Sequence, residues 1–378
     1  MTQTMRISTS ERGPAGRLPE RLPRPSVPAQ RWHLIGSQPM PQTGSPSPYR
    51  PTRREFLIGV TGLLVLAPYG CGTRGGGEGE SGGTRTVQHA MGESEVPAEP
   101  GRIVALSGQM DLDALLALGL QPVAAGANFE NDTAVNPWSQ DRLEEDVEVF
   151  KFRPEPDVEQ IATFEPDLVI GHKGWLEPVY DELSQLAPTV VTEYDGGVDG
   201  EGAMWRGPFR TVARAVGREE RGEEILTEVA AEMERARGRL SELGGLNVSV
   251  FSALEGWQAY FTPESYPGYV LDQLGLSRPG PQTEIPSGAA DPQQIEFSNE
   301  RLDILDGDVA FCLNFGEDEF LDDWESRPLF QSLAVVESGN YVRLSERESN
   351  YWYYPTVSTP PLMLESLIGH LERLGFVG

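Results

Sequence analysis

The chain has 378 residues, and its 30 Lys and Arg against 58 Asp and Glu give a formal net charge of −28 at pH 7. This acidic excess argues against nucleic-acid binding, because neutralising phosphates requires clustered Lys and Arg side chains. Two cysteines and four histidines are too few for a disulfide framework, a Cys-rich zinc site or a His-built metal centre. The length suits one large or two medium domains.

The N-terminal part of the chain differs in composition from the rest. Residues 1–70 hold nine Arg and three Glu, whereas the remainder holds 21 basic and 55 acidic residues. Ten of the 31 prolines fall within the first 51 residues, with few apolar residues between them. Such a composition cannot bury enough surface to offset its ordering entropy. We predict that residues 1–50 are a disordered extension, in which Met1, Met5 and Met40 are all candidate translation starts.

Residues 51–71 have the pattern of a targeting signal. The sequence TRREFL at residues 52–57 resembles the twin-arginine export signal, with Arg53 and Arg54 as its paired arginines. The uncharged apolar run 56–67 is shorter than the roughly 20 residues that a bilayer requires. A short apolar run behind paired arginines indicates export rather than a membrane span or a core helix. We therefore expect the protein in the periplasm or on the outer face of the cytoplasmic membrane.

Cys71 ends this apolar region and is followed by Gly-rich sequence over residues 72–86. The junction resembles that of a bacterial lipoprotein, in which a lipidated cysteine precedes a flexible tether. It departs from the usual pattern because Pro68 stands where a leucine is normal, three residues before the cysteine. Two outcomes follow: a lipid anchor at Cys71, or cleavage nearby that yields a soluble protein.

From about residue 87 the sequence alternates between strand and helix patterns. Apolar runs predict strands at 102–107, 122–127, 167–171 and 188–193, and helical periodicity predicts helices at 110–118, 157–164 and 175–186. Such an alternation implies a parallel sheet with helices on both faces. We assign residues 87–203 to an N-terminal α/β lobe.

Residues 204–245 contain the longest helical pattern, with helices predicted at 208–216 and 218–243 and apolar residues along one face. A second α/β series follows over residues 246–378. It has predicted strands at 247–254, 257–262, 308–313 and 340–344, and predicted helices at 269–274, 299–305 and 359–374. We predict two α/β lobes with mainly parallel central sheets, joined by one long bridging helix.

Residues 85–378 resemble the ABC-transporter substrate-binding proteins for ferric siderophores, haem and cobalamin. The matching segments are 102–106, 155–170 and 297–309. The resemblance implies a monomeric binding protein without catalytic activity or cofactor, which captures an iron chelate between two lobes and delivers it to a membrane permease. It also implies that Glu155 and Glu300, one on each lobe, dock onto permease arginines. The alternative is that both are ordinary acids at helix starts, where the helix dipole favours them.

The ligand is expected between the lobes, on loops at 172–175, 204–206, 255–260 and 351–354. These loops are rich in Trp and Tyr, whose apolar faces and polar edges suit a large chelate. We expect Trp205 and Trp352 to face each other across the ligand. The candidate ligand-binding residues are Lys173, Trp175, Trp205, Arg206, Trp257, Tyr260, Tyr351, Trp352 and Tyr353.

Charge favours one class of ligand. The basic residues near these loops are Lys173, Arg206, Arg343 and Arg347, which are few for a strongly anionic tris-catecholate complex. A hydroxamate-type or mixed-ligand ferric siderophore fits them better. Haem, with His172 or a tyrosine as axial ligand, and cobalamin remain alternatives within the same transporter class.

Two other classes of protein fit the sequence less well. An exported enzyme would need a recognisable catalytic pattern, and the chain has no G-x-S-x-G, P-loop or H-E-x-x-H motif. Asp322 and Asp323 could do glycosidase-like acid/base chemistry, although adjacent acids in so acidic a chain are more typical of a solvated face. A zinc or manganese receptor needs three or four converging ligands, and the histidines beyond the signal are His89, His172 and His370. We expect neither an enzyme nor a resident metal.

Overall fold

The computed structural model describes residues 83–127, 135–152, 155–193, 205–254, 257–283, 293–316 and 318–378. All of them belong to one unit, Pro48–Gly378. The predicted extension, the export arginines Arg53 and Arg54 and the anchor Cys71 lie outside the described residues. Within the described part, no helix combines the length and the apolar composition that crossing a membrane requires.

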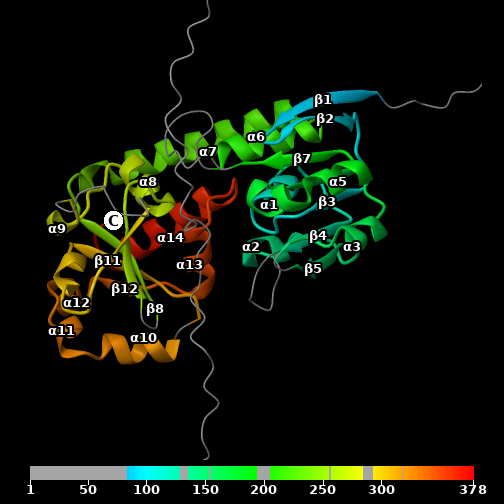
Figure 1. The fold of residues 1–378 in the computed structure, drawn as a ribbon. Coiled ribbons are helices and arrows are strands. Elements are labelled where there is room, and N and C mark those ends of the chain that lie inside the picture. Colours follow the sequence, from blue (N-terminus) through cyan, green and yellow to red (C-terminus); the bar gives the residue numbers. More distant parts are fainter. Residues whose placement is uncertain are drawn as a thin grey trace, which may run out of the picture. The chain divides into compact units, whose positions relative to one another are not determined.

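The first sheet is entirely parallel and has the strand order β5-β4-β3-β6-β7 (Figure 1). Its strands are β3 Ile103–Ala105, β4 Ala124–Ala127, β5 Glu148–Lys151, β6 Leu168–His172 and β7 Thr189–Thr192. Short strands rich in Val, Ile and Ala are expected where both faces of a parallel sheet are covered. We call this sheet and the helices that pack on it the first lobe.

The first lobe's helices are α1 Met110–Ala117, α2 Pro137–Gln140, α3 Val158–Thr163, α4 Lys173–Leu176 and α5 Tyr180–Leu186. Asp157 caps α3, because its carboxylate accepts hydrogen bonds from the backbone N–H groups of Glu159 at 2.9 Å and Gln160 at 3.3 Å. The single helix predicted over 175–186 is instead divided into α4, the 3₁₀ segment η1 Glu177–Val179 and α5. Pro178 explains the break, because proline lacks the N–H that a continuous helix requires.

A β-hairpin that the sequence did not predict precedes the first sheet. It consists of β1 Thr84–His89 and β2 Gly92–Pro97, which pair antiparallel. Gly92 takes φ +126° at the turn, a conformation that side-chain-bearing residues rarely adopt. Ser94 Oγ donates to the Thr189 carbonyl at 2.8 Å, so the hairpin is attached to β7. The start of β1 therefore lies within residues 72–86, the segment predicted to be a tether.

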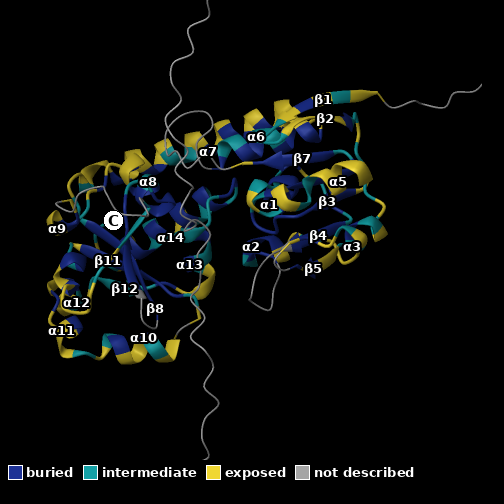
Figure 2. Ribbon diagram, in the orientation of Figure 1, coloured by how far each residue is buried: buried dark blue, intermediate teal, exposed yellow. Residues whose placement is uncertain are grey.

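The long helix lies where it was predicted. After α6 Arg206–Ala215, helix α7 Glu219–Leu240 has 22 residues, or about 33 Å, and ends in the 3₁₀ turn η2 Ser241–Leu243. Ile225, Leu226 and Val229 lie on its buried face, while its Glu and Arg residues are largely exposed (Figure 2). Helix α7 packs against α6 and against the C-terminal helix α14, so it joins the first lobe to the second.

The second sheet has the order β10-β9-β8-β11-β12. Strands β8, β11 and β12 are parallel, whereas β9 is antiparallel to both β8 and β10. Its strands are β8 Val248–Leu254, β9 Trp257–Phe261, β10 Gln294–Glu296, β11 Val309–Leu313 and β12 Tyr341–Arg343. Its helices are α8 Tyr266–Gln273, α9 Gly280–Thr283, η3 Leu302–Leu305, α10 Asp318–Glu325, α11 Pro328–Gln331, α12 Ala334–Glu337, α13 Glu346–Tyr353 and α14 Thr359–Arg373. We call this part the second lobe, and the predicted α/β class is confirmed.

Two second-lobe predictions differ from the structure. The helix expected over 299–305 is reduced to η3, and Asn299 instead uses its side-chain oxygen to accept from Trp324 Nε1 at 2.8 Å. The segment 351–354, expected to be a loop, is mostly the last turn of α13. Helix α13 starts at a capping box, in which Ser345 and Glu348 each bond the other's backbone N–H.

Candidate functional site

A buried carboxylate on α1 connects the two lobes. Asp113 has no exposed surface and accepts hydrogen bonds from Trp138 Nε1 at 3.2 Å and from the backbone N–H of Ser358, in the second lobe, at 3.1 Å. Arg142 Nη1 lies 3.6 Å from the same carboxylate. Burial raises the pKa of Asp113, whereas bonds from Thr356 and Ser358 and the Arg142 charge lower it, and burial prevails.

Further contacts surround Asp113. Arg142 Nη1 donates to Ser358 Oγ at 3.2 Å, and the rings of Trp138 and Tyr351 meet edge-on with centroids 6.5 Å apart. Arg347 Nη2 lies 3.6 Å from Asp141 Oδ2. These contacts join α2 and the residues after it to α13 and to the segment that enters α14. The predicted ligand residue Tyr351 therefore lies where the lobes meet.

Arg206 forms a second connection between the lobes. It is the first residue of α6, and its Nη1 donates to the Tyr269 hydroxyl on α8 at 3.0 Å. The guanidinium carbon is 4.9 Å from the centre of the Trp205 ring and 5.9 Å from that of Tyr269. Both distances are in the range of cation–π attraction. The sequence predicted Trp205 and Arg206 as site residues and missed Tyr269.

The carboxyl ends of β6 and β7 bring together further polar groups. Lys173 Nζ lies 2.8 Å from Glu193 Oε1, which raises the pKa of Lys173. His172 Nδ1 accepts from the Gly174 N–H at 3.1 Å, so Nε2 is the nitrogen left for any other partner. Burial lowers the pKa of His172.

A second buried acid lies at the start of α1. Asp111 has no exposed surface, and its Oδ1 accepts from Thr192 Oγ1 at the end of β7 at 3.0 Å. Burial raises the pKa of Asp111 to about 7, and the bond from Thr192 opposes this. The folded state then holds the proton of Asp111 more tightly than the unfolded chain does. Asp111 therefore contributes most to the free energy of unfolding at pH values near and below 4. Its contribution falls as the pH rises toward 7.

The remaining aromatic candidates have different environments. Tyr353 packs edge-on against Phe261 and Phe315, with ring centroids 5.9 Å and 5.5 Å apart, and is partly exposed. Trp175 is partly exposed and packs against the first lobe's core. Strand β9 begins at Trp257, whose side chain lies outside what the structure describes.

Two of the candidates lie inside the second lobe. Tyr260 and Trp352 each have 0% exposed surface, and the Trp352 ring is 4.8 Å from that of Phe311. Trp205 is 3% exposed, so it does not face Trp352 across an open space as expected. Packing accounts for these positions. The spacing of α13 turns Trp352 toward β11, and β9 is buried on both faces, so that Tyr260 packs in one core cluster and its neighbour Phe261 in another.

Most basic candidates have acidic partners. Arg343 Nη2 lies 2.6 Å from Glu325 and 2.7 Å from Asp322, which raises the pKa of Arg343. Asp323 pairs separately with Arg327, at 3.4 Å. The two carboxylates of the alternative acid/base pair are thus engaged with different arginines. Over the described residues, no group of three or more His, Cys, Asp and Glu side chains is arranged to hold a metal ion.

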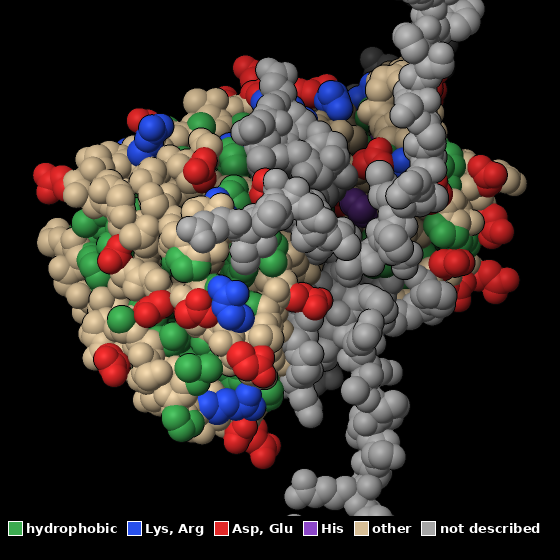
Figure 3. Space-filling model, turned by 60° about the vertical axis from the view of Figure 1, so that its left-hand side comes forward, with side chains coloured by type: hydrophobic (Ala, Val, Ile, Leu, Met, Phe, Trp, Pro, Cys, Tyr) green, Lys and Arg blue, Asp and Glu red, His purple; other side chains and the backbone are tan. Residues whose placement is uncertain are grey.

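The two candidate docking acids are exposed. Glu155 lies between β5 and α3, and Glu300 lies between β10 and η3. Hydrogen bonds with Ser298 and with its own backbone lower the pKa of Glu300. Acidic side chains are scattered over the visible described surface, where Lys and Arg are fewer (Figure 3).

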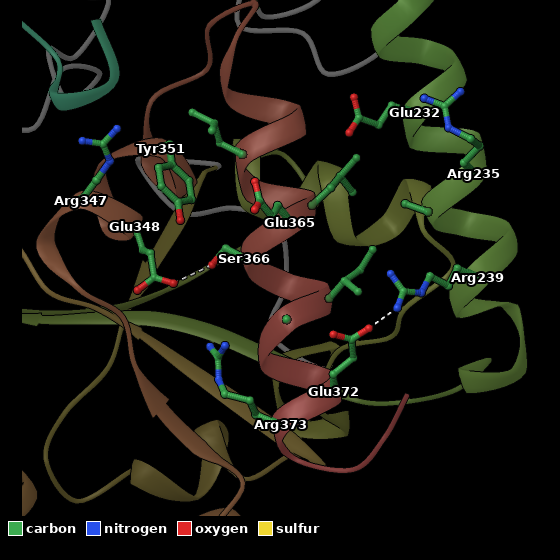
Figure 4. A pocket seen from close by; sticks show the side chains of 15 residues that line it. Glu232, Arg235, Arg239, Arg347, Glu348, Tyr351, Glu365, Ser366, Glu372 and Arg373 are labelled. Carbon is green, nitrogen blue, oxygen red and sulfur yellow. Dashed lines mark hydrogen bonds and ion pairs between the residues drawn. The ribbon is translucent and has the colours of Figure 1, made fainter. Parts of the chain in front are cut away.

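A cavity of about 760 Å³ lies between α7, α13 and α14 (Figure 4). Its walls carry both cationic and anionic side chains, with Arg235 and Arg239 on α7 and Glu365 and Glu372 on α14. Arg239 and Glu372 form an ion pair. Tyr351 is the candidate ligand residue in its lining, so this cavity does not gather the predicted site.

Comparisons with known proteins agree with this architecture. The sequence profile of the periplasmic binding protein family matches residues 103–348. The probable siderophore-binding lipoprotein YfiY of Bacillus subtilis is 36% identical over 298 residues, which cover 75% of this chain and 87% of that protein. The Fe(3+)-citrate-binding protein YfmC of Bacillus subtilis is 26% identical over 300 residues, or 76% of this chain and 89% of that protein. The crystal structure of Staphylococcus aureus SirA complexed with staphyloferrin B is similar in fold, with a TM-score of 0.60, 23% identity and coverage of 76% of this chain and 99% of SirA.

Proposed function

Because this chain belongs to the periplasmic binding protein family, we propose that it is the extracytoplasmic substrate-binding protein of an ABC importer and captures a ferric siderophore between its two lobes. The observation that carries this proposal is the 36% identity to YfiY across 75% of the chain. The two lobes are joined by α7 and meet at contacts such as Asp113 with Ser358 and Arg206 with Tyr269, and ligand sites occur preferentially where domains meet. The relatives are described as binding proteins, which argues against an enzyme.

The binding surface consists of residues near the lobe contact that keep some exposure or lie at its edge. Arg206 and Tyr269 form one part of it, and Tyr351 and Tyr353 form another. Lys173 and Trp175 lie at the carboxyl end of β6. Tyr260 and Trp352 are excluded because their side chains are wholly buried.

The proposed ligand is a hydroxamate-type or mixed-ligand chelate. Lys173, Arg343 and Arg347 each have an acidic partner, so their charges are already balanced. A tris-catecholate complex, which is strongly anionic, would have few cations to meet it. Haem and cobalamin remain the alternatives, and His172 Nε2 is the available imidazole atom for haem.

Intrinsic tryptophan fluorescence of the full chain, titrated with ferric siderophores, ferric citrate, haem and cobalamin, tests this function. We expect saturable quenching by at least one ferric siderophore and weaker binding of its iron-free form. Saturation by haem or cobalamin alone would favour the alternatives. Binding of none of these compounds would contradict the proposed function.

Delivery to the permease is proposed to use Glu155 and Glu300. Both are exposed, and one lies on each lobe, so together they could fix the register of a monomeric protein on its transporter. Arginine or lysine side chains on a partner would donate short, charge-assisted hydrogen bonds to these carboxylates.

Export by the twin-arginine route and anchoring at Cys71 complete the proposal. Replacing Arg53 and Arg54 with lysine should retain the precursor in the cytoplasm, because paired ammonium groups do not reproduce two guanidinium groups.

Cys71→Ser should shift the protein from the membrane to the soluble extracytoplasmic fraction. Cys312→Ser is the matched control, because Cys312 is buried in β11 and should not affect location. Both predictions are measured by cell fractionation and immunoblotting. Normal export of the lysine variant would contradict the export signal, and unchanged membrane association of C71S would contradict the lipid anchor.

A further inference from the structure

The first turn of the C-terminal helix α14 takes its cap from the other lobe. A helix leaves its first four backbone N–H groups without an intrahelical partner, and in α14 these belong to Ser358, Thr359 and residues 360–361. Residues 360 and 361 are prolines, which have no N–H. Thr359 donates to the Thr356 carbonyl at 3.4 Å, and Ser358 donates to Asp113 Oδ2 at 3.1 Å. Asp113 of the first lobe therefore caps a helix of the second lobe.

The surroundings of Asp113 favour a negative charge at this position. Asp113 lies in the first turn of α1 and against the first turn of α14, so it is close to the positive ends of two helix dipoles. Trp138 Nε1 donates to Oδ1 at 3.2 Å, and Arg142 Nη1 lies 3.6 Å from the same oxygen. Arg142 also donates to Ser358 Oγ at 3.2 Å. The carboxylate thus has donors in both lobes, and bonds to an ionised acceptor are stronger than neutral ones.

The contact joins two rigid bodies rather than two loops. Leu112, next to Asp113 on α1, is fully buried in the hydrophobic core. Met363 and Leu367 on α14 are fully buried as well. Neither helix can shift away from its own lobe without exposing buried apolar surface. A movement that separates the lobes at this point therefore breaks the bond between Asp113 and Ser358.

Other polar contacts between the lobes differ from this one in burial or in number of bonds. Arg347 and Asp141 lie 3.6 Å apart, but their side chains are 54% and 77% exposed, and exposed ion pairs contribute little. Arg206 donates a single bond to the Tyr269 hydroxyl at 3.0 Å. Asp113 has no exposed surface, so solvent screens its attraction to its partners less.

We propose that Asp113 is an interlobe latch: its carboxylate holds the first turn of α14 and so restrains separation of the two lobes. The latch adjoins the proposed binding surface, because Trp138, which donates to Asp113, meets the Tyr351 ring edge-on. A role of the latch in admitting and releasing a ligand rests on the proposed function, whereas the latch itself is a property of the fold.

Distance measurements between two spin labels on the full chain, without added ligand, test the latch. Nitroxides at Leu186→Cys in α5 and Leu329→Cys in α11 report on lobe separation, since both positions are exposed and one lies in each lobe. The background is Cys71→Ser, and the buried Cys312 stays unlabelled. Asp113→Asn keeps the size of the side chain and one acceptor oxygen but removes the charge. We expect longer and more broadly distributed distances, with the ratio of separated to closed lobes raised about 10- to 100-fold, the change that losing a charged hydrogen bond produces.

Two further variants separate a latch from a general effect on folding. Asp111→Asn also removes a buried acid from α1, but the partner Thr192 belongs to the same lobe, so the distances should match those of the unmodified protein. Arg142→Gln removes a partly exposed charge beside Asp113 and leaves the core intact. It should shift the distances in the same direction as Asp113→Asn, but less. Thermal melts show which variants fold.

Each outcome decides between the latch and its absence. Unchanged distances in Asp113→Asn, or an equal change in Asp111→Asn, would overturn the latch and leave the transport function intact. Where Asp113→Asn fails to fold, Arg142→Gln decides, and unchanged distances in that variant would overturn the latch. Failure of the unmodified protein to bind any ferric chelate in the fluorescence titration would overturn the proposed function and leave the latch standing.

Discussion

Trp352→Ala should lower the free energy of unfolding by about 3–5 kcal/mol, the usual cost of truncating a large buried aromatic side chain. Trp352 has no exposed surface, its ring lies 4.8 Å from that of Phe311, and its Nε1 donates to Ser366 Oγ at 3.2 Å. Truncation would leave a cavity between α13, β11 and α14, whereas Ser366 Oγ would keep its hydrogen bond to Glu348 Oε1 at 2.9 Å. Chemical denaturation monitored by circular dichroism measures the loss.

Two further variants show whether packing is the cause. Trp352→Phe fills most of the volume and removes the indole N–H, so it should cost only about 1–2 kcal/mol. Trp175→Ala truncates a partly exposed tryptophan of the first lobe and should cost less than Trp352→Ala. If Trp352→Ala were as stable as the unmodified protein but bound chelate weakly, the ring would belong to the binding surface after all.

The alternating elements of the first lobe were predictable because their signals are local. Runs such as 102–107 and 167–171 are short, apolar and bounded by polar residues, which is the pattern of a buried parallel strand. The break at Pro178 had a local signal too, since proline rarely continues a helix.

The aromatic segment 351–354 was misassigned for a different reason. Its flanking residues are polar, which suggested an exposed loop, yet Ser345 and Glu348 have the spacing of a capping box. A helix starting there places Ser349 and Trp352 three residues apart on one face, and both are buried. The spacing could therefore have predicted both the helix and the burial of Trp352.

The polar contacts of the two buried acids and of Arg206 had no signal in the sequence. Asp111 and Asp113 lie in the first turn of α1, where acids are normally exposed and favoured by the helix dipole. Their partners are distant along the chain, Thr192 by 81 residues and Ser358 by 245. Folding alone brings these groups together, and the same holds for Arg206 and Tyr269, which are 63 residues apart.

Glu155→Arg combined with Glu300→Arg should abolish uptake of the iron chelate while leaving its affinity unchanged. If both acids meet cations on the permease, reversal replaces attraction by repulsion, at a cost on the order of several kcal/mol at the interface. Each single reversal should only impair uptake, because the remaining contact could hold a tilted complex. Both side chains are exposed, so thermal stability should change little.

A matched pair of reversals distinguishes docking from a general effect of charge. Glu182 in α5 and Glu319 in α10 are exposed acids in the first turns of their helices, one in each lobe, and their reversal changes the net charge equally. Radiolabelled iron uptake in cells should be normal for E182R/E319R and absent for E155R/E300R. Equal uptake by the two pairs would mean that Glu155 and Glu300 are ordinary solvated acids. Loss of chelate binding in E155R/E300R would instead place the ligand site near the lobe tips, because an exposed charge far from the ligand has no means of abolishing its binding.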